Sequence, residues 1–164
     1  MAIRLIAIGL ACALGLQAAV AAELVGRVVA ITDGDTLTIL DAGRRQHKVR
    51  IAGIDAPEKR QPWGERSRQH MANLAFGKSP LADCYKKSYE RQVCRVYVAG
   101  ADVGLAQVAA GLAWWYRKYA NEQTAEDRGR YEAAEQEARS RRLGLWADPQ
   151  PVPPWEWRAA RRRK

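Results

Sequence analysis

Three short segments combine acidic and arginine side chains of the kind that hydrolyse a phosphodiester bond. They are Thr32–Thr36 (TDGDT), Val49–Glu58 (VRIAGIDAPE) and Tyr89–Val93 (YERQV). Carboxylates are ligands that a hard divalent cation prefers, and an arginine fork binds phosphate oxygens in pairs. Together they could activate a water molecule, offset the charge of the phosphate and stabilise the transition state.

The acidic side chains suit a metal ion and an attacking water molecule. Asp35 lies at a tight turn between two predicted strands, and Asp55 follows a strand that runs into a loop. Both are candidate metal ligands, and a backbone carbonyl near Ala56 could add a third oxygen. Glu58, just beyond Pro57, is the candidate for positioning and deprotonating water.

Two arginines complete this candidate site. Arg50 lies on a predicted strand and Arg91 at a strand edge, so both could reach one phosphate. Each residue also has an ordinary structural interpretation. Asp33 can satisfy the backbone donors of a common turn, Arg50 can face solvent, and Arg91 beside Glu90 is typical surface composition. From the residues alone, the catalytic and structural interpretations stay equally open.

Short strands must position the first two segments. Alternating β-branched residues predict an antiparallel meander of three strands at residues 24–31, 36–40 and 46–54. Prolines and clustered charges predict a loop over residues 56–62. A helix is expected over residues 64–76, ended by Gly77.

The rest of the chain adds two strands and two helices. The strands are predicted at residues 79–84 and 93–98 around a polar turn at 85–90, and the helices at 103–110 and 124–142. Residues 143–157 predict an extended strap whose tryptophans pack over the fold, with base stacking as the alternative. Five strands with a helix after the third predict an α+β fold: a five-stranded OB-type β-barrel with three helices.

The first residues have the layout of a secretory signal peptide. Arg4 precedes an apolar run at residues 5–16 and a small-residue stretch at 18–22, where cleavage is expected. A membrane anchor is the alternative, but the run is shorter than the ~20 residues of a spanning helix. Lipid attachment through Cys12 is a second alternative. We expect an exported protein, periplasmic or extracellular after cleavage.

The chain is therefore expected to have three parts. They are a signal peptide at residues 1–22, an OB-type domain at 23–148, and a strap with a basic tail at 149–164. The expected mature chain keeps two cysteines, Cys84 and Cys94. In an oxidising compartment this spacing predicts a disulfide across a hairpin, and two unpaired, half-buried thiols are the alternative.

The charge distribution favours a polyanionic partner. The formal net charge is +9, and five of the cations lie in the tail: Arg158, Arg161, Arg162, Arg163 and Lys164. Such a tail suits nucleic acid, because each phosphate contact releases counterions. No second hydrophobic segment follows the expected signal peptide, so we expect no membrane contact after cleavage, and a monomer.

The order of these segments resembles the staphylococcal nuclease family. The matching motifs are DGDT at 33–36, the stretch from Arg50 to DAPE at 55–58, Tyr-x-Arg at 89–91, GLA at 111–113 and LGLW at 143–146. The resemblance covers roughly residues 24–157. It implies an OB-barrel endonuclease that uses one calcium ion and acts on DNA and RNA with little sequence preference.

The resemblance also implies a role for each residue by its position. Asp35, Asp55 and the carbonyl of Ala56 would hold calcium. Arg50 and Arg91 would bind the scissile phosphate, and Glu58 would be the general base. Three residues would contact substrate: Tyr89, Tyr119 and Arg117, the last replacing an expected tyrosine.

The third motif departs from the family pattern, Asp-x-Tyr-Gly-Arg. Here it reads Lys87-Ser88-Tyr89-Glu90-Arg91. Glu90 replaces a glycine that tolerates positive φ, so we expect a differently shaped turn before Arg91.

Two functions from different classes remain. The first is an exported nuclease. The second is a catalytically silent OB-fold that only binds nucleic acid. The acids Asp35, Asp55 and Glu58 favour the enzyme, because without a metal they would repel phosphate.

Overall fold

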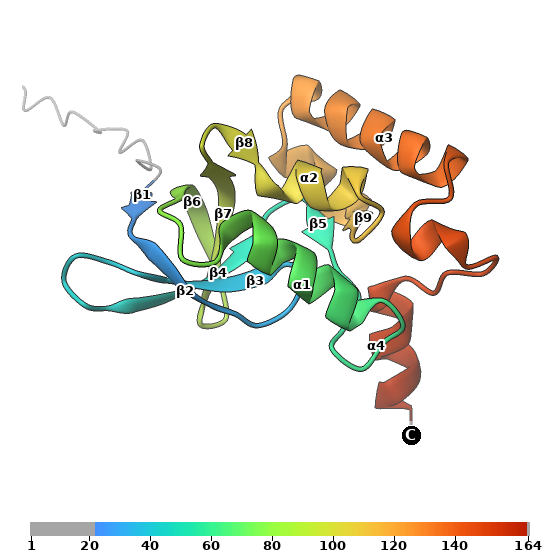
Figure 1. Ribbon diagram of the computed structural model, residues 1–164, viewed down its shortest axis with the longest axis horizontal. Helices are drawn as coiled ribbons and strands as arrows, with labels where there is room; N and C mark the ends of the chain where they lie inside the picture. The colour runs from blue at the N-terminus through green and yellow to red at the C-terminus, as the bar shows by residue number, and fades with distance from the viewer. Residues whose placement is uncertain (1–21, 164) are drawn as a thin grey trace, which may run out of the picture.

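The computed structural model describes residues 22–163. The predicted signal peptide lies outside the described residues, apart from Ala22, which is the first residue of strand β1. No helix in the described part of the chain is long and apolar enough to cross a membrane. The architecture is α+β, as predicted, with a large mixed sheet flanked by helices (Figure 1).

The main sheet has seven strands in the described residues, rather than five. They are β1 (Ala22–Val25), β2 (Arg27–Ile31), β3 (Thr36–Leu40), β4 (Gln46–Ile51), β6 (Leu81–Ser88), β7 (Arg91–Val98) and β8 (Ala101–Asp102). Their order is β1-β6-β7-β4-β3-β2, and β8 pairs with β7. β5 (Ile54–Asp55) and β9 (Trp114–Trp115) form a separate antiparallel pair. The predicted count was wrong because Gly26 splits the first strand and because β8 adds a strand beside β7. Residues 52–53 also separate β5 from the third predicted strand.

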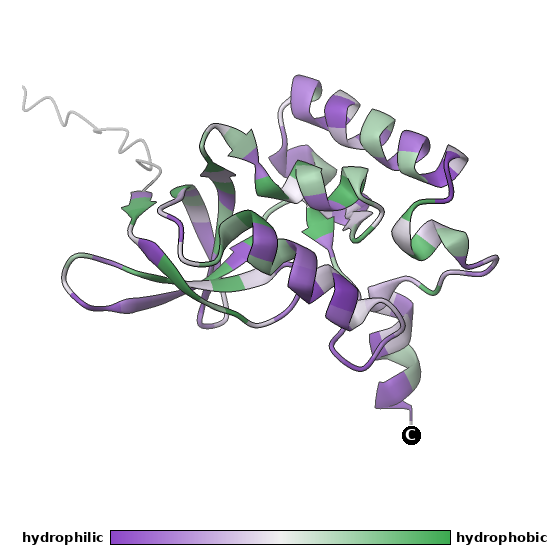
Figure 2. Cartoon of the chain, in the orientation of Figure 1, coloured by the Kyte–Doolittle hydropathy of each residue, from purple (hydrophilic) through white to green (hydrophobic). Residues whose placement is uncertain are grey.

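The register of the sheet brings the predicted site segments together. β3 and β4 are antiparallel with Thr36 opposite Arg50, whereas β4 and β7 are parallel with Arg50 opposite Val93. The parallel pairing therefore places the start of β7, where Arg91 lies, next to the arginine of β4. Buried side chains such as Leu37 and Val49 anchor these strands in the core. Figure 2 shows the hydrophobic residues concentrated along the strands.

Four α-helices occur in residues 22–163, one more than predicted. They are α1 (Gly64–Ala75), α2 (Val103–Ala109), α3 (Ala125–Ser140) and α4 (Pro154–Arg162). Two short 3-10 helices, η1 (Arg117–Glu122) and η2 (Gly144–Ala147), flank α3. The three predicted α-helices occur in the expected order, and the additional α-helix lies at the C-terminal end.

α4 replaces the end of the predicted extended strap. Pro154 occupies the first turn, where proline needs no hydrogen-bond donor, and the first-turn acid Glu156 and last-turn Arg161 and Arg162 complement the helix dipole. The packing role of the tryptophans is confirmed for Trp155, which stacks on Tyr116 at 5.4 Å between ring centroids. This aromatic contact holds α4 against the domain, at the end away from β1 (Figure 1).

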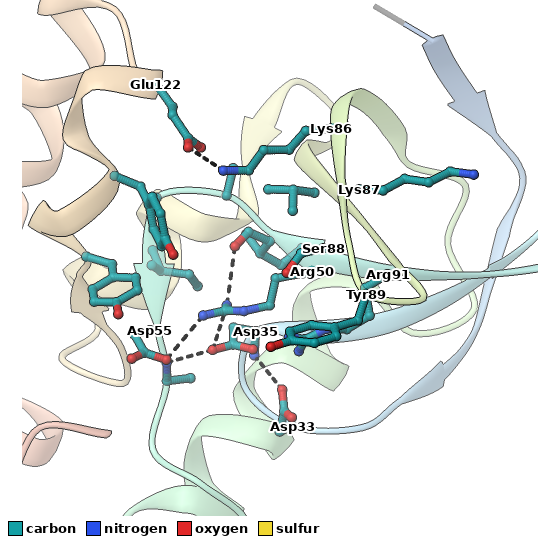
Figure 3. Close-up of a pocket in the computed structure, with 18 of the residues that line it drawn as sticks. Asp33, Asp35, Arg50, Asp55, Lys86, Lys87, Ser88, Tyr89, Arg91 and Glu122 are labelled. Carbon is teal, nitrogen blue, oxygen red and sulfur yellow. Dashed lines mark hydrogen bonds and ion pairs between the residues drawn. The ribbon is translucent and has the colours of Figure 1, made fainter. Parts of the chain in front are cut away.

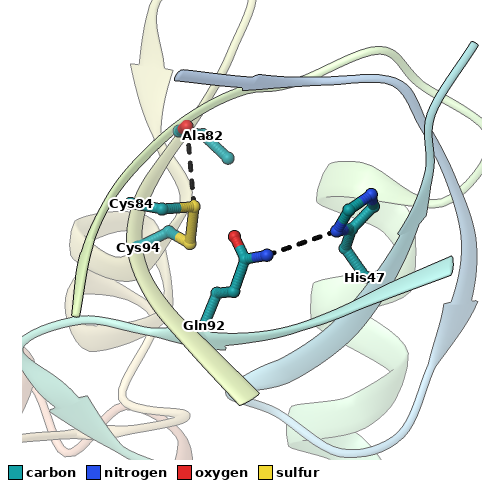
Figure 4. The surroundings of a disulfide bond; sticks show 5 residues. All are labelled: His47, Ala82, Cys84, Gln92 and Cys94. Atoms are coloured by element: carbon teal, nitrogen blue, oxygen red, sulfur yellow. Dashed lines mark hydrogen bonds between the residues drawn. A yellow bond between two sulfur atoms is a disulfide. The ribbon is translucent and has the colours of Figure 1, made fainter. Parts of the chain in front are cut away.

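A disulfide joins Cys84 to Cys94, as predicted. The two residues lie directly opposite each other on β6 and β7, with 4.0 Å between their Cα atoms. Figure 4 shows the bond beside Gln92, whose side chain contacts the ring of His47 on β4. β6 continues to Ser88, so the predicted polar turn at 85–90 was too long: only Tyr89 and Glu90 lie between the strands.

Candidate active site

A cavity of about 530 Å³ opens where β4, β5, the β6–β7 hairpin, η1 and α4 meet. Its wall includes nearly all of the predicted site residues: Asp35, Arg50, Asp55, Ala56, Glu58, Tyr89, Arg91 and Tyr119. Figure 3 shows Asp35, Asp55 and Arg50 gathered on one side. Tyr89 and Arg91, on the hairpin, face them. Residues more than fifty positions apart thus share one hollow.

The two carboxylates among the candidate metal ligands are buried, and hydrogen bonds fix that of Asp35. Asp35 is 5% exposed and Asp55 is 1% exposed. The backbone N–H of Ala56 donates to Oδ2 of Asp35 at 2.8 Å, which ties the β2–β3 turn to the end of β5. The hydroxyl of Thr36 donates to Oδ1 of Asp35 at 3.0 Å. The carboxylate of Asp35 is therefore oriented before any ligand arrives.

Arg50 joins the two carboxylates. Its Nη1 lies 2.7 Å from Oδ2 of Asp35 and its Nη2 lies 3.1 Å from Oδ1 of Asp55. The flanking Val49 and Ile51 are buried on the opposite face of β4, so strand alternation points Arg50 into the cavity. Only 15% of its side chain is exposed, so the interpretation of Arg50 as a solvent-facing residue is wrong.

Two carboxyl groups in the cavity have raised pKa values. Burial raises the pKa of the Asp55 carboxyl, against the opposing bonds from Arg158 and the charge of Arg50. Burial, followed by the neighbouring Asp35 carboxylate, raises the pKa of Asp33 to about 7. Asp33 also accepts the backbone N–H of Asp35 at 3.0 Å, which confirms its role in the turn.

Arg158 is a site residue that the sequence interpretation missed. Its Nη2 lies 2.7 Å from Oδ2 of Asp55, and its Nη1 lies 2.7 Å from Oε1 of Glu58. The side chain comes from α4, a hundred residues beyond Glu58, and is 37% exposed. The sequence does contain signals for this helix, namely a proline at its start, an acid in its first turn and arginines in its last turn. No local pattern indicates that Arg158 contacts Asp55 and Glu58.

The hairpin side of the cavity is more open. Tyr89 is 95% exposed. Nη1 of Arg91 donates to the hydroxyl of Thr36 at 3.5 Å. The positive φ of this turn, 55°, is that of Tyr89, and Glu90 at the glycine position of the family pattern has no positive φ. Lys87, which stands where the family pattern has an aspartate, also lines the cavity.

The structure does not bring all predicted substrate contacts into the cavity. Tyr119 lies on its wall, with the ammonium of Lys86 4.6 Å from its ring centroid. Arg117 lies outside, where its guanidinium pairs with the buried Glu135 at 2.7 Å and stacks on Trp115. A phosphate contact by Arg117 in this cavity therefore has no support from the geometry.

The chemistry of the acids fits a hard metal ion. Asp35 and Asp55 offer buried oxygen donors only, and both need a positive counter-charge, which Arg50 and Arg158 provide. In residues 22–163, no three acidic, histidine or cysteine side chains are grouped closely enough to share an ion. Both carboxylate oxygens of Asp55 accept hydrogen bonds from the guanidinium of Arg158.

The match to the family model begins within β4. The family model described as staphylococcal nuclease homologue matches residues 48–148, which include Arg50, Asp55, Glu58 and Arg91. This chain belongs to the staphylococcal nuclease family. The matched region leaves out Asp35 on the N-terminal side and the whole of α4 on the C-terminal side.

Relatives in this nuclease family cover most of the chain. An uncharacterized endonuclease of Haemophilus influenzae is 40% identical over 133 residues, which are 80% of this chain and 71% of the relative. A micrococcal nuclease of Shigella flexneri is 40% identical over 149 residues, 85% of this chain and 83% of the relative. Protein ParB of Escherichia coli is 41% identical over 147 residues, which are 84% of this chain and 80% of the relative.

Proposed function

We propose that this member of the staphylococcal nuclease family is a calcium-dependent endonuclease that hydrolyses DNA and RNA with little sequence preference. The observation that carries the proposal is the bridge by Arg50 between two buried carboxylates, at the wall of a cavity that also contains Arg91 and Glu58. A site of this kind combines hard oxygen ligands with cations that bind phosphate.

Calcium would be held by Asp35, Asp55 and the backbone carbonyl of Ala56. When bound, the ion would supply positive charge to the phosphate and lower the pKa of a water molecule. The bond between the Ala56 N–H and Asp35 holds these donors near one another. The guanidinium of Arg158, which now contacts both oxygens of Asp55, would leave to make room for the ion.

The remaining residues would act on the phosphate and the attacking water. Arg50 and Arg91 would bind the phosphate oxygens from opposite walls and stabilise the additional negative charge of the transition state. Glu58, once free of Arg158, would accept the proton of the attacking water. Tyr89 and Tyr119 would contact the nucleotide at the mouth of the cavity.

One observation favours the second candidate, a silent nucleic-acid-binding protein. Arg158 neutralises both Asp55 and Glu58 in this structure, so the cavity already offers positive charge to a phosphate without a metal ion. Such a protein would bind nucleic acid through Arg50, Arg91 and Arg158 and leave it intact. Metal-dependent cleavage separates the two functions.

We further propose that the protein is exported and acts as a monomer outside the cytoplasm. The disulfide between Cys84 and Cys94 supports an oxidising compartment, and the signal-peptide pattern of residues 1–22 points the same way. The OB-type barrel is part of the proposal: β1 and β2, at opposite ends of the strand order, are separated only by Gly26.

The proposal is tested by the release of acid-soluble fragments from single-stranded DNA and from RNA. The oxidised protein is assayed with calcium, magnesium or EDTA, alongside Glu58→Gln and a control on α3, Glu137→Gln, whose side chain is exposed. Calcium-dependent release that falls by about 100-fold or more in Glu58→Gln alone is expected. Binding without cleavage under any metal would support the silent protein instead.

A further inference from the structure

A second hollow, of about 450 Å³, adjoins the catalytic cavity between α4 and the loop after β5. Glu58, Arg158 and Arg162 line both hollows, so the two are neighbours that share a wall. A further hollow shares Lys59, Arg60 and Trp157 and extends to the start of α1. We call the combined surface the α4 groove, defined by Lys59, Arg60, Trp63, Arg66, Trp157, Arg161 and Arg162.

The α4 groove has an excess of positive charge. Its five cations are Lys59, Arg60, Arg66, Arg161 and Arg162, which are all exposed. None of them is within ion-pair distance of an acidic group in residues 22–163. The two acids that line these hollows are engaged elsewhere, since Glu58 pairs with Arg158 and Glu65 with Arg68. Gathered like charges repel one another, and a polyanion relieves that repulsion.

The arrangement of α4 directs this charge along one path. Arg158 and Arg162 are one helical turn apart on the same side of α4, about 6 Å along its axis. Arg162 reaches the wall of the catalytic cavity, and Arg161 lines the groove only. A chain of phosphates that leaves the cavity past Arg162 would therefore meet Arg161, Arg60 and Lys59 in the groove.

Aromatic rings lie between these cations. Trp157 and Trp63 are half-buried residues of the groove wall. The guanidinium of Arg66 lies over the ring of Trp63, with 4.6 Å to its centroid. Cations interleaved with aromatic rings are typical of surfaces that bind a single strand, whose bases are free to stack. This pattern favours a single strand over a duplex or an acidic protein.

We propose that the α4 groove binds the part of a single nucleic-acid strand that flanks the phosphate being cleaved. The proposal rests on the nuclease function and adds a binding surface that lies partly beyond the region matched by the family model, since α4 follows residue 148. The C-terminal cations would then hold the strand in line with Arg50 and Arg91.

The test measures DNA binding without cleavage. The double variant Arg60→Gln/Arg161→Gln removes two groove cations, and the matched control Arg45→Gln/Lys48→Gln removes two exposed cations near the β3–β4 turn, at the other side of the molecule (Figure 1). The affinity for a labelled single-stranded oligonucleotide is measured in EDTA over a range of salt concentrations. Acid-soluble fragment release with calcium is measured in parallel on the wild type.

The groove variant is expected to bind about tenfold more weakly, and the slope of log affinity against log salt should fall by about 1.4, or ~0.7 for each lost phosphate contact. The control should keep the wild-type slope. Equal losses in both variants, no loss in either, or a preference for duplex over single strand would overturn the proposal. A wild type that binds through the groove but does not cleave would overturn the nuclease function and leave the groove standing.

Discussion

The two walls of the catalytic cavity differ in how firmly their residues are held. On the acid wall, Asp35 and Asp55 are buried and Arg50 is bonded to both. On the hairpin wall, Tyr89 is almost fully exposed and Arg91 makes one long contact to the hydroxyl of Thr36. The acid wall is formed by the turn before β3, by β4 and by β5, whereas the hairpin wall is the tip of two strands joined by a disulfide.

This contrast indicates that the two walls have different roles in stability and in the binding of substrate. Buried carboxylates need counter-charge for the fold itself, so Arg50 contributes to stability as well as to the proposed chemistry. Arg91 has no comparable partner among the described residues, so its charge remains available to the phosphate. We therefore expect the acid wall to be in place before substrate binds and the hairpin wall to take its final geometry on the substrate.

The largest expected effect on cleavage is that of Arg50→Lys. The variant keeps the charge but loses the planar fork that spans the two aspartates. We expect DNA cleavage to fall by about 1,000-fold and the free energy of unfolding to fall by about 2 kcal/mol. Fragment release and urea denaturation measure the two quantities. Loss of activity with unchanged stability would remove the distinction between the walls.

Arg91→Lys is the matched change on the hairpin wall. Cleavage is expected to fall by about 100-fold, because the second phosphate fork is lost. The free energy of unfolding should stay within about 0.5 kcal/mol of the wild type, because Arg91 makes little contact with the folded chain. A destabilisation as large as that of Arg50→Lys would show that the hairpin arginine is also part of the framework.

The disulfide determines how loose the hairpin wall can become. Replacing both partners, Cys84→Ala/Cys94→Ala, is expected to lower the free energy of unfolding by about 3 kcal/mol, because the unfolded chain gains conformational entropy when the bond is absent. The fold-increase in the KM for DNA should exceed the fold-increase in the Kd for calcium, because the bond lies on the hairpin strands. The measurements are urea denaturation, steady-state kinetics and calcium titration. Equal changes in KM and in calcium affinity would contradict a separate hairpin wall.

The smallest effect is expected at the tip of the hairpin. Tyr89 holds a positive φ that asparagine adopts more readily than tyrosine. Tyr89→Asn should therefore raise the free energy of unfolding by about 0.5 kcal/mol and raise the KM for DNA by a few-fold through loss of the exposed ring. Thermal unfolding and kinetics check the two changes, and a variant with improved KM would exclude a substrate contact by Tyr89.

The acid wall could be predicted from the sequence because its signals are local. Alternation around Arg50 defines a strand, and the DGD turn and the DAP segment each mark the end of one. What the sequence could not show is that Arg50 faces inward, because the side chains around a strand residue come from distant segments. Arg50 is paired with Asp35 and Asp55. Strand pairing and the bond from Ala56 to Asp35 bring these two acids close to it.

The C-terminal end was harder to predict. Consecutive prolines favour an extended chain, yet a proline at the first turn is compatible with the helix that begins at Pro154. Arg158 resembles the other cations of the basic tail, and it is brought to Asp55 and Glu58 by contacts such as the packing of Trp155 on Tyr116. The contact spans about a hundred residues and so has no local signature.

Calcium titration by calorimetry tests the central claim most directly, namely that a calcium ion binds at Asp55 in the place of Arg158. The wild type, Asp55→Asn and Arg158→Gln are compared, with thermal unfolding as a second readout. We predict one calcium ion per wild-type chain, no binding by Asp55→Asn, and about tenfold tighter binding by Arg158→Gln, a gain of roughly 1.4 kcal/mol. Calcium should also raise the melting temperature of Arg158→Gln more than that of the wild type. Equal calcium affinity in all three proteins, or no binding in any, would contradict the account.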